Sequence, residues 1–148
     1  MVSEVDEVDL KIISELLENA RKPFREIAKK IQLSDVAVIK RVRKLEKTGV
    51  IKKYALVLDP SKLGFNKVSI TGINVRPEKL LEVASKLKEK PYIKFLAIGS
   101  GDHEILAMIW ARDSDEIMKI HEELRNIEGV IEVYPCIVSE VLKRETYI

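Results

Sequence analysis

Apolar residues in the first fifty positions recur with helical spacing in three separate segments. In residues 9–20 they stand three and four positions apart, which predicts an amphipathic helix. Pro23 restarts the chain into a second, shorter helix, which ends in a tight turn at residues 32–33. Ser34 can cap a third helix, which ends at Gly49. The second and third helices, joined by this tight turn, indicate a helix-turn-helix arrangement.

The segment after the third predicted helix changes to a different pattern. Residues 50–51 are apolar, and residues 54–58 continue as an alternation, which together predict one or two short strands. Asp59-Pro60 then breaks the pattern. Three short helices followed by a small β wing predict a winged helix-turn-helix domain over residues 1–60.

Residues 61–148 combine alternating apolar segments with two amphipathic helical ones. The expected order is strand, helix, strand, strand, helix, strand, at residues 67–75, 80–87, 93–98, 104–111, 114–127 and 130–141. This βαββαβ order predicts an α+β, ferredoxin-like second domain, in which helices cover one face of the sheet. Residues 105–110 are apolar on both faces. A second subunit is the simplest cover for the other face, so we expect at least a homodimer.

Charge is distributed unevenly along the chain, although the net charge is only +2. Residues 1–20 hold one base and six acids, whereas residues 21–53 hold twelve bases and three acids and carry a net charge of +9. Such a concentration of positive charge is typical of a segment that binds a polyanion, such as nucleic acid. The solvated, charge-rich surface of a thermophilic protein gives a similar count, so charge alone leaves both interpretations open.

The predicted third helix is apolar on one face and basic on the others. Val38, Val42 and Leu45 form the apolar stripe, so this helix can enter a major groove with its basic side outward. Lys and Arg there suit phosphates and base edges. We predict a DNA interface at Ser34, Ala37, Lys40, Arg41, Arg43, Lys44, Lys52 and Lys53. Because Arg41 lies off the apolar stripe, its replacement by alanine should weaken DNA binding without unfolding the chain.

The sequence lacks the signals of several other classes of protein. Cys136 is the only cysteine, and no Cys or His pair has the spacing of zinc ligands, so we predict no metal site and no cofactor. No apolar run approaches the roughly 20 residues of a membrane span, and the acidic start lacks the apolar region of a signal peptide. We therefore expect a cytoplasmic protein. The 18 lysines, 17 glutamates and single glutamine fit a thermophile.

Short motifs run through the whole chain. In the first domain and hinge they are Val8-Asp9, Asn19-Ala20-Arg21, Glu26-Ile27-Ala28, Leu33-Ser34, Arg41-Val42-Arg43-Lys44-Leu45-Glu46, Thr48-Gly49-Val50-Ile51, Leu58-Asp59-Pro60 and Leu63-Gly64. The second domain carries Ser100-Gly101-Asp102-His103-Glu104. Together with the domain order, these motifs resemble the Lrp/AsnC transcriptional regulators of archaeal type. The last motif occupies the place of that family's Gly-Asp-Tyr-Asp effector loop, with His-Glu in place of Tyr-Asp.

The resemblance implies a RAM-type effector-binding and oligomerisation domain in residues 61–148. It implies dimers that pair through their sheets and assemble further into tetramers or octamers. It also implies a small-molecule effector, usually an amino acid, bound at Ser100, Gly101, Asp102, His103 and Glu104. Gly101 leaves backbone N–H groups free for a carboxylate, and Asp102 or Glu104 can accept an ammonium group. The residues by themselves also fit an ordinary hairpin turn, and that alternative stays open.

Three functions follow from these patterns. The first is a sequence-specific regulator that binds double-stranded DNA and responds to a small molecule. The second is an architectural protein of low specificity that wraps DNA through phosphate contacts. The third is an enzyme, which would need a convergent acid–base or nucleophile set; the sequence shows none, so we predict that the protein is not an enzyme.

Overall fold

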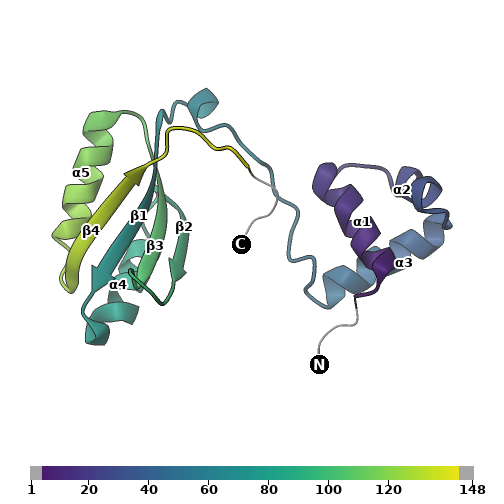
Figure 1. The fold of residues 1–148 in the computed structure, drawn as a ribbon, viewed down its shortest axis with the longest axis horizontal. Helices are drawn as coiled ribbons and strands as arrows, with labels where there is room; N and C mark the ends of the chain where they lie inside the picture. The colour runs from purple at the N-terminus through teal and green to yellow at the C-terminus, as the bar shows by residue number, and fades with distance from the viewer. Residues whose placement is uncertain (1–4, 144–148) are drawn as a thin grey trace. The chain divides into compact units, whose positions relative to one another are not determined.

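The structure is a computed structural model, which describes residues 5–143. The chain divides into two compact units, of which the first runs through Val57 and the second spans Leu58–Leu142 (Figure 1). The division lies close to the expected domain boundary at residue 60.

Three helices form the N-terminal unit: α1 (Glu7–Glu18), α2 (Phe24–Ile31) and α3 (Asp35–Lys47). Their shared core consists of buried apolar side chains from all three helices, namely Ile12, Leu16, Ile27, Ala28, Val38 and Val42. The turn between α2 and α3 passes through Gln32 with a φ of 58°, a left-handed conformation that reverses the chain within a few residues. The predicted helix-turn-helix is therefore confirmed.

The predicted wing is wrong. Residues 52–59 form neither helix nor strand. A strand needs a neighbouring strand to satisfy its backbone hydrogen bonds, and within the described chain this segment pairs with none. Its apolar side chains are also left uncovered, as the 82% exposure of Leu56 shows. An alternating pattern identified an extended segment here, but alternation alone does not supply a pairing partner.

The C-terminal unit follows the predicted βαββαβ order. Its elements are β1 (Lys67–Val75), α4 (Leu80–Lys88), β2 (Ile93–Ile98), β3 (Ile105–Ala111), α5 (Ser114–Arg125) and β4 (Val130–Ile137). All three strand pairings are antiparallel, in the spatial order β2-β3-β1-β4. The α+β, ferredoxin-like prediction is confirmed, although the last strand ends at Ile137 rather than at residue 141.

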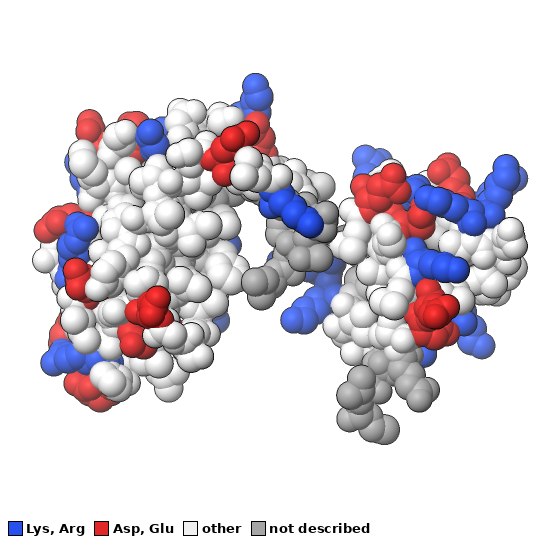
Figure 2. Space-filling view, viewed as in Figure 1, with Lys and Arg blue, Asp and Glu red and all other residues white. Residues whose placement is uncertain are grey.

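The two faces of this sheet differ in what covers them. On one face α4 and α5 bury alternate strand residues, including Ile73, Ile105 and Ile109. On the other face Ile70 and Leu106 stay exposed, at 46% and 39%. Figure 2 shows a broad area without charged side chains on the visible face of this unit. The described chain thus covers one side of the sheet only.

A short chain of polar side chains lies within the helix-covered layer. Ser69 and Thr71 of β1 are hydrogen-bonded through their hydroxyls at 2.8 Å, and Thr71 Oγ1 lies 3.1 Å from Nε2 of His121 on α5. All three residues are buried. Burial, with a smaller contribution from the Arg125 charge, lowers the pKa of His121 below 6.5. The folded protein therefore holds this imidazole neutral.

We expect His121 to make the C-terminal unit less stable in acid. As the pH falls through 6.5, the unfolded chain takes up a proton at His121 that the folded chain still excludes, so the free energy of unfolding decreases. Thermal unfolding at pH 7.5 and 5.5 measures this loss. His121→Gln should reduce the difference between the two pH values, because it removes the group that titrates. If the difference were undiminished in His121→Gln, His121 would not be the cause of the lower stability in acid.

Candidate DNA interface and effector loop

Helix α3 has one buried apolar face and one exposed basic face. Val38, Val42 and Leu45 are buried, as the sequence pattern predicted. Lys40 and Arg43 are exposed, and neither makes a hydrogen bond or ion pair within the described chain. Lys44 is also exposed on this helix. The charges of Lys40 and Arg43 are therefore open to solvent.

The remaining predicted interface residues flank this basic face. Ser34 caps α3, and its Oγ accepts a hydrogen bond from the Ala37 N–H at 3.2 Å. Lys52 and Lys53 are exposed in the segment that follows the helix. Because no wing forms, these two lysines lie on an extended chain instead of a β-strand.

Arg41 is the predicted interface residue whose surroundings differ most from expectation. Its Nη1 donates to Asp6 Oδ2 at 2.6 Å and to Asp9 Oδ1 at 2.8 Å, both at the start of α1. The guanidinium is therefore bonded within the N-terminal unit and does not extend freely into solvent. Although Arg41 lies off the apolar stripe, we now expect Arg41→Ala to destabilise the N-terminal unit, because this change strips the fully buried Asp9 of its cation.

Asp6 and Asp9 also begin helix α1. The Asp9 N–H donates to Asp6 Oδ1 at 2.8 Å and the Asp6 N–H donates to Asp9 Oδ2 at 3.3 Å, which is a reciprocal capping box. The hydrogen bond from Arg41 is the main reason that the pKa of Asp6 lies below its usual value. The same two acids raise the pKa of Arg41. Asp6 and Arg41 therefore stay charged at neutral pH.

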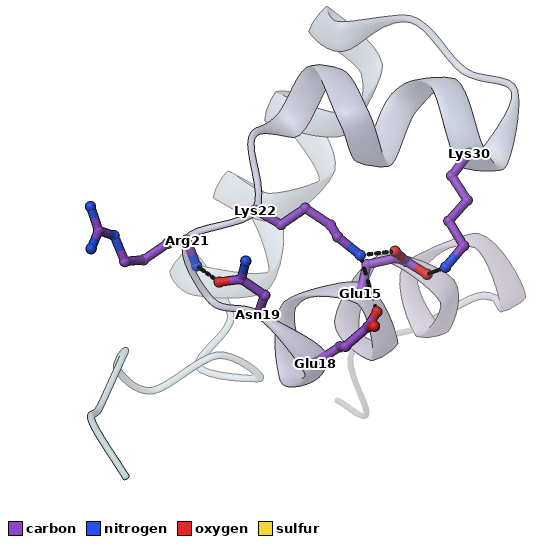
Figure 3. Close-up of polar contacts among 6 residues, drawn as sticks. All are labelled: Glu15, Glu18, Asn19, Arg21, Lys22 and Lys30. Carbon is purple, nitrogen blue, oxygen red and sulfur yellow. Dashed lines mark hydrogen bonds and ion pairs between the residues drawn. The ribbon is translucent and has the colours of Figure 1, made fainter. Parts of the chain in front are cut away.

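A second carboxylate of α1 binds cations from the helix-turn-helix (Figure 3). Each carboxylate oxygen of Glu15 pairs with one lysine: Oε2 lies 2.6 Å from Nζ of Lys22, and Oε1 lies 2.6 Å from Nζ of Lys30 at the end of α2. Lys22 also reaches Glu18 at 3.0 Å. Lys22, and then Lys30, lower the pKa of Glu15, which is only 8% exposed. Part of the positive charge of residues 21–53 is thus neutralised by the acidic first helix.

One exposed residue of α3 was not among the interface residues predicted from the sequence. Val36, near the N-terminus of α3, is 74% exposed. It lies off the stripe of Val38, Val42 and Leu45, and an apolar side chain on the outer face of a basic helix is a signal that the sequence itself contained. A side chain at this position can contact the methyl group of thymine in a major groove.

The predicted effector loop joins β2 to β3 as a hairpin. Gly99 N–H donates to the Glu104 carbonyl at 2.9 Å across the base of the loop. Ser100, Gly101 and Asp102 are exposed, and Gly101 has a φ of 130°, which favours glycine. Glu104 turns inward, where its Oε2 accepts from the Val75 N–H at 3.1 Å. Of the two acids considered for an ammonium group, Asp102 is the exposed one.

His103 packs over the middle of strand β1. Its Nδ1 lies 2.9 Å from Asn74 Oδ1, and its ring centroid lies 4.7 Å from that of Tyr134 on β4. A Cβ added at Gly72 would approach ring atoms of His103 to 2.3 Å. The absence of a side chain at Gly72 therefore makes the space that the imidazole fills.

The described chain also bears on two other kinds of site. Among residues 5–143, no group of three His, Cys, Asp or Glu side chains is placed to hold a metal ion. Each helix in the same range is too short or too polar to cross a membrane.

Comparisons with known proteins assign the chain to a family. The family model of the AsnC-type helix-turn-helix domain matches residues 5–46, and that of the Lrp/AsnC ligand binding domain matches residues 68–148. The chain belongs to the Lrp/AsnC family. Its Lrp/AsnC relatives include the HTH-type transcriptional regulator LrpA of Pyrococcus horikoshii, 47% identical over 97% of this chain and 100% of the relative.

Solved structures of transcriptional regulators share the fold over nearly the whole chain. B. subtilis LrpC is 27% identical, with a TM-score of 0.85 over 95% of this chain and 99% of that one. The NMB0573/L-Met complex from Neisseria meningitidis is 22% identical, with a TM-score of 0.87 over 97% and 95%. The protein is thus a DNA-binding transcriptional regulator with a ligand-binding domain, and its relatives are named as regulators rather than enzymes.

Gly72→Ala should destabilise the C-terminal unit by about 1–3 kcal/mol, the usual cost of overpacking, because the new methyl group displaces the His103 ring. Chemical denaturation monitored by circular dichroism measures this. The double variant Gly72→Ala/His103→Ala should cost less than the sum of its single changes. Gly99→Ala is the matched control, since a Cβ there meets only the His103 carbonyl at 3.9 Å. If the two losses of stability simply add in the double variant, Gly72 and the His103 ring are independent.

Proposed function

We propose that the protein binds specific double-stranded DNA sequences through the exposed face of α3 and that a small molecule at the 100–104 loop modulates this binding. The observation that carries the first part is that Lys40 and Arg43 make no hydrogen bond or ion pair among residues 5–143, beside a buried apolar stripe on the same helix. A helix with its apolar side anchored and its cations outward suits a major groove. A regulator of this kind acts on chromosomal DNA, so we place the protein in the cytoplasm.

The residues of the interface divide by what they contact. Arg43, Lys40 and Lys44 reach base edges or phosphates, and Val36 contacts a thymine methyl group. Ser34 and Ala37 form the start of the helix and approach the DNA backbone with it. Lys52 and Lys53 bind phosphates. Arg41 leaves this set because its guanidinium is bonded to Asp6 and Asp9.

An amino acid is the class of effector that the loop suits. The structure of NMB0573, which shares the fold, is a complex with L-Met. In this chain Gly101 allows a ligand to approach the backbone, and Asp102 is an exposed carboxylate that can accept an α-ammonium group. His103 and Glu104 support the loop through Asn74 and Val75.

A homodimer that assembles further, to a tetramer or octamer, fits the open face of the sheet. Ile70 and Leu106 are exposed on that face, and Met108 is partly covered. An apolar surface of this kind is typical of a subunit interface. Two subunits related by a two-fold axis would present two α3 helices to a pseudo-palindromic DNA site.

The direct test is a fluorescence anisotropy titration with a duplex selected from a random pool by the full-length protein. The selected duplex should bind more tightly than a scrambled one, and affinity should fall steeply as salt increases. Lys40→Ala and Arg43→Ala should weaken binding. Replacing a residue that contacts a phosphate should also reduce the slope of log affinity against log salt by about 1. Lys119→Ala, an exposed lysine of α5, is the control. Failure to enrich any sequence, with steep salt dependence retained, would support the architectural alternative.

Effector binding is tested with the same duplex and each of the twenty amino acids. At least one should change the apparent DNA affinity or the sedimentation coefficient of the protein. Asp102→Ala should abolish that response and leave effector-free DNA binding unchanged, because Asp102 is exposed and lies outside the helix-turn-helix. Asp115→Ala, an exposed acid at the start of α5, should respond like the wild type. If Asp102→Ala still responds fully to the amino acid, the loop is a hairpin turn and does not bind the effector.

A further inference from the structure

Two acids at the start of α1 converge on a single cation of α3. Asp6 is the N-cap of α1, Asp9 lies in its first turn and Arg41 lies in the middle of α3, yet both hydrogen bonds that Arg41 donates to these acids are shorter than 3 Å. Asp9 is completely buried, whereas Lys40 and Arg43, which flank Arg41 along the helix, are exposed. One residue of α3 thus faces α1 while residues beside it face solvent.

A helix anchored in this way has a defined rotation about its own axis. A helix with its side chains is about 10–12 Å across, so a rotation of about 15° moves a side-chain tip by about 1.4 Å. Hydrogen bonds to base edges tolerate about 0.5 Å. A modest rotation of α3 would therefore remove base contacts while leaving the looser attraction between its lysines and the phosphates in place. The apolar stripe alone, with Val38 and Val42, resists such a rotation less sharply than a hydrogen-bonded ion pair does.

We infer that Asp6 and Asp9, by holding Arg41, set the rotation of α3 and so act as positioning residues for sequence-specific DNA recognition. This inference rests on the proposed function, in which α3 reads the DNA. It explains why a DNA-binding unit carries two acids beside its recognition helix, where unpaired carboxylates would repel phosphates. It also assigns Arg41 to orientation, although its sequence position places it among the basic residues.

Asp9→Asn gives the sharpest test because the two possible effects have opposite signs. Removing a negative charge from a DNA-binding unit strengthens its electrostatic attraction for any duplex. Loss of positioning instead weakens binding to the selected duplex. We expect the affinity ratio between the selected and the scrambled duplex to fall about fivefold or more, which corresponds to one lost base contact. The dependence of log affinity on log salt should keep its wild-type slope.

Glu15→Gln is the matched control. Glu15 is also a buried carboxylate of α1 with two cation partners, but those partners are Lys22 and Lys30, outside α3. Its replacement should lower the melting temperature and leave the affinity ratio at the wild-type value. Arg41→Lys is the second variant, used in case Asp9→Asn does not fold. It retains the charge but loses the planar guanidinium, so it should lower the same ratio.

The outcomes separate the two proposals. If the wild-type protein prefers no sequence, the proposed function fails and the inference fails with it. If the wild type is selective and folded Asp9→Asn keeps its ratio or binds both duplexes more tightly, only the inference is overturned. An unchanged ratio in folded Arg41→Lys, which keeps the charge but loses the guanidinium, would also overturn the inference.

Discussion

Ion pairing between the acidic first helix and the basic helices after it is the interaction on which the N-terminal unit depends. Asp9 and Glu15 are buried on α1, and they bind cations from α3 and from α2 and its preceding loop. A buried carboxylate without a cation is strongly destabilising. These pairs therefore restrict which faces of the three short helices can meet, and the small apolar core then fills the space between them.

The C-terminal unit depends on a different kind of contact. Its helices and sheet are joined by a larger apolar layer, and its buried polar groups, Thr71 and His121, are bonded to each other within that layer. The loop that carries Asp102 emerges from the edge of this rigid sheet. The division into two units keeps the packing of α3 separate from the packing of this sheet.

Most of the fold could be predicted from the sequence, but less of the DNA interface could. Periodicity located the three helices and the βαββαβ order because each element depends on residues close together in the chain. It misjudged residues 52–59, since strand formation depends on a partner that periodicity does not reveal. It also placed Arg41 at the DNA, because the spacing of one helix says nothing about acids that lie more than thirty residues earlier.

For a related reason, the charge count overstated how many cations are available to an external partner. A net charge of +9 over residues 21–53 treats every cation as available, whereas Lys22, Lys30 and Arg41 are bonded to acids of the first helix. The cations left for an external partner are fewer than the count suggests. The exposure of Val36 shows the converse case, in which an uncharged residue lies where the recognition surface is expected.

The packing of His103 over Gly72 has a consequence for how this loop can diverge. Because the imidazole occupies the volume that any Cβ at position 72 would need, the two positions cannot both carry bulky side chains. Homologues with a larger residue in the strand should compensate with a smaller or redirected one in the loop. The two positions should therefore covary, and a change of effector preference that alters the loop would leave a second, linked substitution in the middle of the sheet.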